Sequence, residues 1–330
     1  MKKAVEILVN QIIIFSLIGS IVGICSHYFT EIAIFSAEFV RDSVDYQSIG
    51  FVGWNAAIKI ATALFIAALV ISLLIRFSKI DRFHGPADVI LASIDNKSPI
   101  KIKEGIISGL VSSTSLCAGA PVGQYGPLVH ISATLASFLR RLENIGSINY
   151  RLLMGSSVSA AIASAFGAPI GGIIFSQEVI LRNFSLKYFA PIAISSASSF
   201  ITTNYLFGNE NLINIEKTFN INPIYMMIVV IVGLLGGVAA YYYSKSLMTL
   251  NRAATGSGIP LQWRPFLGIL PIILIGIFIP QVLGLGVETI SNVLNNRLDV
   301  WILLAVLVAK FVLTPISISF GLFGGVFSPA

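Results

Sequence analysis

The chain has 330 residues, of which 55% are hydrophobic and only 11% are charged, and its mean hydropathy is +0.87. A soluble protein carries about a quarter charged residues, so this composition excludes an ordinary soluble domain. The net charge of +6 comes from basic residues scattered among the connections between apolar stretches, which argues against a nucleic-acid-binding protein.

Long apolar stretches recur along the chain, at residues 7–24, 56–75, 225–240, 266–283 and 300–316. Each is long enough to span, or nearly span, a hydrocarbon core about 30 Å thick. The first stretch extends too far for a signal peptide, and no A-x-A cleavage site follows it, so we interpret it as an uncleaved membrane helix. The sequence therefore predicts an all-α, multi-pass membrane protein.

Other apolar segments, at residues 87–94, 168–180 and 286–294, are too short to cross a membrane at about 1.5 Å per residue. Short helices interrupted by glycine or proline usually end near the bilayer midplane, where their ends line a cavity walled by protein. We expect broken helices of this kind here.

A polar break at residues 204–223 divides the chain into two parts, each with long apolar helices followed by a short one. Internal repeats of this kind are typical of transporters and channels that place their site at the repeat interface. We predict a single transmembrane domain over residues 1–330 with inverted-topology repeats. Residues 1–206 form the first repeat and residues 219–330 an incomplete second repeat.

Three glycine-containing breaks precede or interrupt apolar helices: His-Gly-Pro-Ala-Asp at 84–88, Gly-Gln-Tyr-Gly-Pro at 123–127 and Gly-Val-Phe-Ser-Pro at 325–329. The first amides of a helix lack partners within the helix, and the helix dipole is positive at that end. Such helix starts can bind an anion without a formal cation. Three breaks, together with Ala-Phe-Gly-Ala-Pro-Ile-Gly-Gly at 165–172, are more specific than one.

The order of these motifs resembles the CLC family of chloride channels and chloride/proton antiporters. That family carries a G-S-G-I-P-like break, then G-[KR]-E-G-P, an A-x-F-x-A-P helix and G-x-F-x-P. Residues 123–127, 165–169 and 325–329 are similar to the last three, in the same order along nearly the whole chain. A literal Gly-Ser-Gly-Ile-Pro at 256–260 comes after the other elements, and we interpret it as a chance match in a connecting loop.

The resemblance implies that chloride binds at the helix starts. His84 takes the place of the family's serine, residues 123–126 match the outer segment, and the amides of Val326 and Phe327 match the central donors. The implied anion-binding and pore residues are His84, Gly85, Gly123, Gln124, Tyr125, Gly126, Val326 and Phe327.

Two departures from the family pattern bear on proton coupling. Tyr125 stands where the family has the gating glutamate, and Val179 stands at the inner proton-relay position, after Glu178. A phenol, with an ordinary pKa of about 10, stays neutral at pH 7, and valine carries no proton. We therefore expect a passive chloride or small-anion channel with Tyr125 at the gate. A chloride/proton antiporter and a non-conducting truncated homologue are the alternatives.

Simpler interpretations stay open for the residues singled out. His84 could cap the following helix, Tyr125 could be a packing residue, and Glu178 could be structural. We expect interior or interfacial positions for His27 and His130. Lys310 should snorkel or pair internally, and Gly171 and Gly172 should allow close helix contact. Cys25 and Cys117 should be buried packing residues and not a disulfide or metal pair.

Other classes of protein fit less well. The chain lacks G-x-S-x-G, H-E-x-x-H and paired-aspartate motifs, so we expect no enzyme activity, no metal and no cofactor apart from bound chloride.

The resemblance implies a homodimer in membrane lipid, and we expect the bacterial inner (plasma) membrane. The chain stops at Ala330, where a further helix should begin, so we expect a C-terminally incomplete family member.

Overall fold

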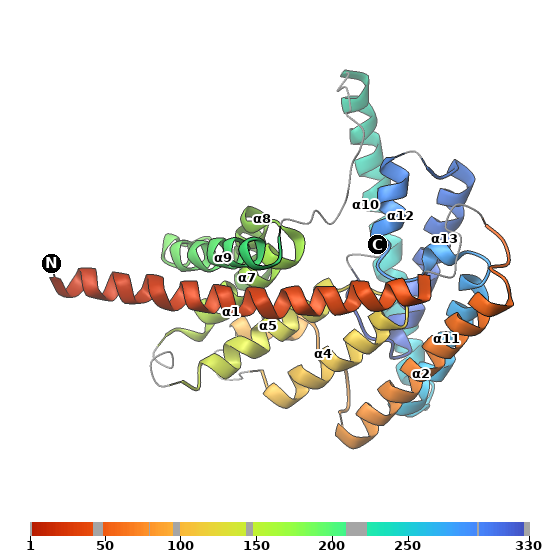
Figure 1. The fold of residues 1–330 in the computed structure, drawn as a ribbon, viewed down its shortest axis with the longest axis horizontal. Coiled ribbons are helices and arrows are strands. Elements are labelled where there is room, and N and C mark those ends of the chain that lie inside the picture. Colours follow the sequence, from red (N-terminus) through yellow and green to blue (C-terminus); the bar gives the residue numbers. More distant parts are fainter. Residues whose placement is uncertain are drawn as a thin grey trace. The chain divides into compact units, whose positions relative to one another are not determined.

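The computed structural model describes residues 2–41, 49–78, 80–94, 100–142, 148–208, 223–295 and 297–326, and these residues fold mainly into helices (Figure 1). The α-helices are α1 (Lys2–Arg41), α2 (Trp54–Ser78), α3 (Pro86–Ile94), α4 (Ile102–Cys117), α5 (Tyr125–Leu139), α7 (Tyr150–Phe166), α8 (Pro169–Phe175), α9 (Leu186–Phe207), α10 (Pro223–Gly256), α11 (Arg264–Gly276), α12 (Val287–Leu294) and α13 (Val300–Ser319). The π-helix η1 (Ser176–Leu181) and the 3-10 turns η2 (Leu261–Trp263) and η3 (Pro280–Val282) join some of them.

Four stretches of the described helices are long and apolar enough to cross a membrane: Val9–Ile34, Trp54–Ser78, Tyr225–Gly256 and Val300–Ser319. They coincide with four of the five long apolar stretches in the sequence. Most side chains on Tyr225–Gly256 are exposed although they are apolar, as lipid-facing residues are. The prediction of an all-α, multi-pass membrane protein is confirmed.

The apolar stretch at residues 266–283 is not one long helix, so its interpretation as a membrane span was wrong. Helix α11 ends at Gly276, and the 3-10 turn η3 begins at Pro280. Proline lacks the N–H that would continue a helix, and its ring clashes with the preceding turn. Gly276 also packs against Leu283, because a Cβ at Gly276 would lie only 2.8 Å from Leu283 Cδ2. The chain therefore folds back within this stretch.

The short segments form short helices, as predicted. Helix α3 begins at Pro86, α8 begins at Pro169, and α12 begins after Gly286, whose φ of 84° is left-handed. Proline suits the first turn of a helix, where its missing N–H would have no partner within the helix.

The described residues divide into two compact units, each drawn from separate parts of the chain. Unit 1 comprises Met1–Phe35, Arg82–Ser113 and Gln124–Leu212, and unit 2 comprises Ser36–Asp81, Thr114–Gly123 and Ile213–Ala330.

Helix α7 is the core of unit 1, where it packs against α5, α8 and α9 (Figure 1). Most of its residues are buried, and many are glycine, alanine or serine. Small residues let helix backbones approach closely in a membrane protein. The approach is close enough for serine hydroxyls of α9 to reach the α7 backbone: Ser195 donates to Ser156 O at 3.1 Å and Ser199 to Ala160 O at 2.7 Å.

Glycines extend this close packing to neighbouring helices. A Cβ at Gly172 would lie 2.6 Å from the Ser159 carbonyl oxygen, so the packing role expected of Gly172 is confirmed. At Gly171 the nearest atom, Ala168 Cβ, is 3.5 Å away, which is ordinary contact, so Gly171 does not have that role.

Replacing Gly19 by alanine is expected to destabilise unit 1 by about 1–3 kcal/mol, because it overpacks the contact between α1 and α9. The new Cβ would overlap the backbone carbonyl of Ser195, which cannot rotate away as a side chain could. Unfolding of purified protein in mixed micelles, with SDS as denaturant, measures the loss. Gly233→Ala on α10 is the matched control, since nothing lies within 4 Å of its Cβ position. Equal stability of the two variants would contradict the prediction.

In unit 2, α11 packs against α2 and α13, and α10 packs against α13. Helix α10 ends at Gly256, and the Gly-Ser-Gly-Ile-Pro sequence at 256–260 then connects it to η2 with Gly258 at a left-handed φ of 70°. Most of this connection is exposed. Its interpretation as a connecting loop is confirmed.

Candidate anion-binding site

The first break, at residues 84–88, starts helix α3 in unit 1. Gly85 precedes the helix, and its N–H donates to the carboxylate of Asp88, three residues later, at 2.9 Å. This hydrogen bond is one of the two in a capping box. In it, the side chain of the third helical residue accepts from the backbone N–H of the residue that precedes the helix. Arg82 also pairs with Asp88, with Nη2 2.5 Å from Oδ1.

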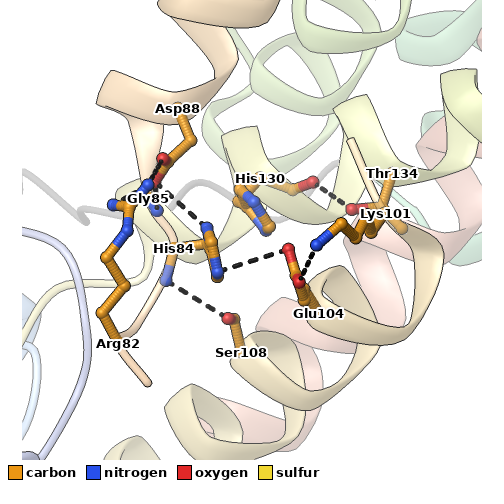
Figure 2. Close-up of polar contacts among 9 residues, drawn as sticks. All are labelled: Arg82, His84, Gly85, Asp88, Lys101, Glu104, Ser108, His130 and Thr134. Carbon is orange, nitrogen blue, oxygen red and sulfur yellow. Dashed lines mark hydrogen bonds and ion pairs between the residues drawn. The ribbon is translucent and has the colours of Figure 1, made fainter. Parts of the chain in front are cut away.

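His84 lies at the centre of a polar cluster, which we call the His84 cluster and define as Arg82, His84, Asp88, Lys101, Glu104 and His130 (Figure 2). Its ring Nδ1 is 3.6 Å from Asp88 Oδ2, and its Nε2 is 3.4 Å from Glu104 Oε2. The backbone N–H of His84 donates to Ser108 Oγ at 3.4 Å. The amides of His84 and Gly85 thus have partners within unit 1, and anion binding by these two residues stays a prediction.

Asp88→Asn is expected to lower the stability of the protein at pH 7 by about 0.5–1 kcal/mol, because it removes a negative charge from the first turn of α3. Burial raises the pKa of Asp88, but the Gly85 amide and the Arg82 guanidinium outweigh burial and hold the pKa below its ordinary value. A carboxylate with a depressed pKa stabilises the fold above its unfolded-state pKa, and that stability disappears as pH falls through the folded-state value.

The difference between wild type and Asp88→Asn should therefore be present in full at pH 5–7 and begin to decline below about pH 4, the ordinary pKa of an aspartate. It should be lost as pH falls through the lower folded-state pKa of Asp88. Thermal unfolding between pH 3 and pH 7 measures it. Asp81→Asn, which changes an exposed carboxylate in the preceding segment, is the control. A difference that stays constant down to pH 3 would contradict the prediction.

The second break starts helix α5 at Tyr125. Gln124 is the residue before the helix, and no side chain within the described residues caps this helix end. Gln124 is 1% exposed, and its side-chain Oε1 has no hydrogen-bond partner in the part of the chain that the structure describes. Gly126 is buried as well. An uncapped, buried helix start is the local feature that an anion site requires.

The Tyr125 ring packs against two phenylalanines of unit 1. Phe175, at the end of α8, meets it edge to face with ring centroids 5.1 Å apart, and Phe166, at the end of α7, lies 6.3 Å away. Edge-to-face aromatic pairs are favourable beyond the area that they bury. The packing interpretation of Tyr125 is thus supported, and its role as gate stays a prediction.

The inner relay position lies in η1, which continues α8 as a π-helix from Ser176 to Leu181. Glu178 is exposed there, and Val179 follows it. Single π-turns in helices occur often at functional sites, but this one places no carboxylate at residue 179. Arg182 then ends the π-helix with a φ of 50°, the one positive φ at a non-glycine residue within the described ranges.

The second and third breaks meet through a backbone bridge within unit 2. Gly123 N–H donates to Gly325 O at 2.7 Å, and Gly325 N–H donates to Gly123 O at 2.5 Å. Glycine at 324 is required by this approach, because a Cβ there would lie 2.5 Å from Val122. The amide of Gly123 therefore has a backbone partner. Val326 follows the bridge in a bend, and Phe327 lies outside the described residues.

Lys310 is a buried cation in unit 2, on the membrane-spanning helix α13. Its Nζ donates to the carbonyl of Gly284 at 3.4 Å. The expectation that Lys310 pairs internally is confirmed.

The other two histidines have the positions expected for interior or interfacial residues. His130 is buried, and the ring of His27 stacks on that of Phe207 with ring centroids 3.9 Å apart. Both cysteines, Cys25 and Cys117, are free, as expected, but the expectation that they are buried was wrong for Cys25, which is exposed.

Comparison with known proteins identifies the family to which this fold belongs. The family described as "Voltage gated chloride channel" matches residues 66–330. The chain belongs to this family, the CLC family. CLC relatives include "Voltage-gated ClC-type chloride channel ClcB" of Salmonella typhimurium, 25% identical over 254 residues that cover 75% of this chain and 59% of the relative. An uncharacterized protein of Methanocaldococcus jannaschii is 24% identical over 244 residues, covering 74% of this chain and 61% of that protein. The chain thus spans about three fifths of the length of these relatives.

Solved CLC structures have the same fold. A CLC-type fluoride/proton antiporter superposes with a TM-score of 0.79 at 21% identity, covering 98% of this chain and 78% of the antiporter. A slow cyanobacterial Cl⁻/H⁺ antiporter superposes with a TM-score of 0.76 at 20% identity, covering 97% of this chain and 76% of the other. The CLC fold is therefore that of the described chain, and the protein is an integral membrane protein.

Several residues of the His84 cluster were missed in the sequence. Asp88 could have been found, because it stands three residues after Gly85, the spacing of a capping box. Glu104 and Ser108 lie on α4, 20 or more residues from His84, and no local pattern connects them to it. Their contacts arise only when α3 and α4 fold into the same unit.

Proposed function

We propose that this CLC protein conducts chloride or similar small anions passively across a bacterial inner membrane. The observation that carries the proposal is Tyr125 at the start of α5. A neutral side chain packed between Phe166 and Phe175 stands where a carboxylate would alternate with chloride. Without that carboxylate, and with Val179 at the inner position, the family's proton route has no titratable group at either end.

The proposed anion-binding residues are at the starts of α3 and α5 in unit 1 and, in unit 2, in the segment that contains Val326. The start of α5 supports anion binding there, because Gln124 and Gly126 are buried and no side chain within the described residues caps the helix. The remaining proposed pore residues are His84, Gly85, Gly123, Gly126 and Phe327. The proposed partners are chloride, membrane lipid and a second copy of the protein, as in a homodimer.

Proton-coupled antiport is the second candidate function, because both solved structures described above are named as antiporters. Their names also make fluoride a worthwhile second anion to test. A non-conducting homologue is the third candidate, and it predicts no flux of any anion.

Anion efflux from proteoliposomes separates these functions. Purified protein is reconstituted in vesicles loaded with potassium chloride, and efflux is started with valinomycin, with and without a proton ionophore. A channel gives efflux that needs valinomycin and ignores the proton ionophore. An antiporter takes up protons against their gradient when chloride leaves. Protein-free vesicles are the control, and vesicles with protein that behave like them would contradict both transport functions.

A further inference from the structure

The ring of His84 faces a carboxylate at each of its two nitrogens. Asp88 Oδ2 is 3.6 Å from Nδ1, and Glu104 Oε2 is 3.4 Å from Nε2 (Figure 2). A neutral imidazole has one N–H, so its other nitrogen would turn a lone pair toward a carboxylate oxygen. The doubly protonated ring presents an N–H and positive charge to both carboxylates. The geometry around His84 is therefore complementary to the protonated form.

Both carboxylates are fixed by further partners, so they do not depend on His84 for their positions. Asp88 accepts from the Gly85 amide and pairs with Arg82, and Glu104 pairs with Lys101 at 2.8 Å. The two cations and two carboxylates cancel in charge. A proton on His84 then gives the cluster one positive charge, and its loss leaves the cluster neutral.

His130, on the neighbouring helix α5, explains why the cluster takes a single proton. Its ring lies 5.9 Å from that of His84, is 2% exposed, and has no hydrogen-bond partner for Nδ1 among the described residues. Two imidazolium rings at this separation repel each other, so protonation of one disfavours protonation of the other. His84 is the ring that faces both carboxylates.

Part of the His84 cluster lies at the surface of the described chain. The side chain of His84 is 17% exposed and that of Glu104 is 29% exposed, whereas His130 is buried. The titratable or charged groups that face His84 from its own segment, α3, α4 and α5, within the described chain, are Arg82, Asp88, Lys101, Glu104 and His130.

We propose that His84 is a proton-binding site, held between the carboxylates of Asp88 and Glu104 at the start of α3. The bound proton adds one positive charge to the cluster at the start of α3, and that charge would attract an anion nearby. The effect on anion flux rests on the proposed function, whereas the proton site itself does not. The site includes neither residue 125 nor residue 179, where the two departures from the family's proton route lie.

Histidine-selective isotope labelling and NMR of the protein in lipid nanodiscs test the site directly. The chain has only three histidines, so His84→Gln assigns the His84 ring by its disappearance. Glu104→Gln removes an opposite charge within about 4 Å and should lower the titration midpoint of that ring by about 1 pH unit. Lys101→Gln removes the positive charge beside Glu104, so the Glu104 carboxylate attracts the proton on His84 more strongly. This variant should therefore raise the titration midpoint of the His84 ring.

Glu178→Gln is the matched control, because Glu178 is an exposed glutamate of the same unit outside the His84 cluster, and it should leave the midpoint unchanged. Should Glu104→Gln not fold, Lys101→Gln still decides, since the Lys101 side chain is 77% exposed. Midpoints that are the same in wild type, Glu104→Gln and Lys101→Gln, or that move in one direction in both variants, would overturn the proposal.

Anion flux at different pH tests the consequence for transport. Wild-type flux should be higher at pH 5 than at pH 8, and His84→Gln should remove that difference. Flux that is independent of His84 would overturn the link to the anion. If no flux occurs at any pH, the proposed function fails, while the NMR titration still decides whether His84 binds the proton.

Discussion

Tyr125→Glu is expected to make anion flux rise at least about tenfold between pH 8 and pH 4, relative to wild-type protein measured at the same pH. A carboxyl group with a pKa of about 6 or lower is more than about 90% ionised at pH 7. The ionised group competes with the anion for the amides at the start of α5, and the protonated group does not. Flux should therefore be blocked at high pH and recover on acidification.

The comparison with wild type at each pH removes the contribution of the His84 cluster from this measurement. Tyr125→Phe is the matched control, because it keeps an aromatic ring to pack against Phe166 and Phe175 and adds no titratable group. It should follow wild type across the range. A ratio of Tyr125→Glu to wild-type flux that stays constant from pH 4 to pH 8 would place residue 125 outside the path.

Gly286→Ala is expected to destabilise unit 2 by about 2–4 kcal/mol, for two separate reasons. Gly286 has a φ of 84°, and a left-handed conformation costs about 1–2 kcal/mol for a residue with a Cβ. The Cβ would also overlap the Nζ of Lys310, which is buried and donates to the Gly284 carbonyl. Moving the ammonium would break that hydrogen bond in a place where an unpaired charge is costly.

A double-mutant cycle separates the two reasons. In the background of Lys310→Met the steric conflict is removed, so Gly286→Ala should cost only the backbone strain, and the coupling energy should be about 1 kcal/mol or more. Gly258→Ala is the control for strain alone, because Gly258 has a φ of 70° with nothing within 4 Å of its Cβ position. Unfolding by SDS in mixed micelles supplies the free energies, and simple additivity of Gly286→Ala and Lys310→Met would contradict the role of Lys310.

The fold was predictable where the sequence carries a local physical signal. Proline marks the starts of α3 and α8, and long apolar runs mark four of the membrane-spanning stretches. The stretch at 266–283 was wrongly predicted to be one membrane-spanning helix, because hydropathy alone does not show where a helix ends. Pro280 follows the end of α11, but Pro271 lies inside the same helix, so proline alone does not mark where the helix ends. The π-helix η1 has no sequence rule that would have identified it.

The candidate site was predictable only in part, because its contacts depend on tertiary structure. The glycine breaks identified the helix starts, but not that the Gly85 amide is occupied by Asp88 or that Gly123 pairs with Gly325. The pairing of His84 with Glu104 joins a residue that precedes α3 to a residue on α4. A single sequence without aligned relatives contains no record of such pairs.

The bridge between Gly123 and Gly325 has a consequence for how the protein is made. The ribosome adds about 5–20 residues per second, so Gly325 emerges about 10–40 seconds after Gly123. During that interval, the peptide groups of Gly123 are without the partner that they have in the finished protein. The segment before α5 therefore acquires its final backbone pairing late in biosynthesis, after α13 has been synthesised.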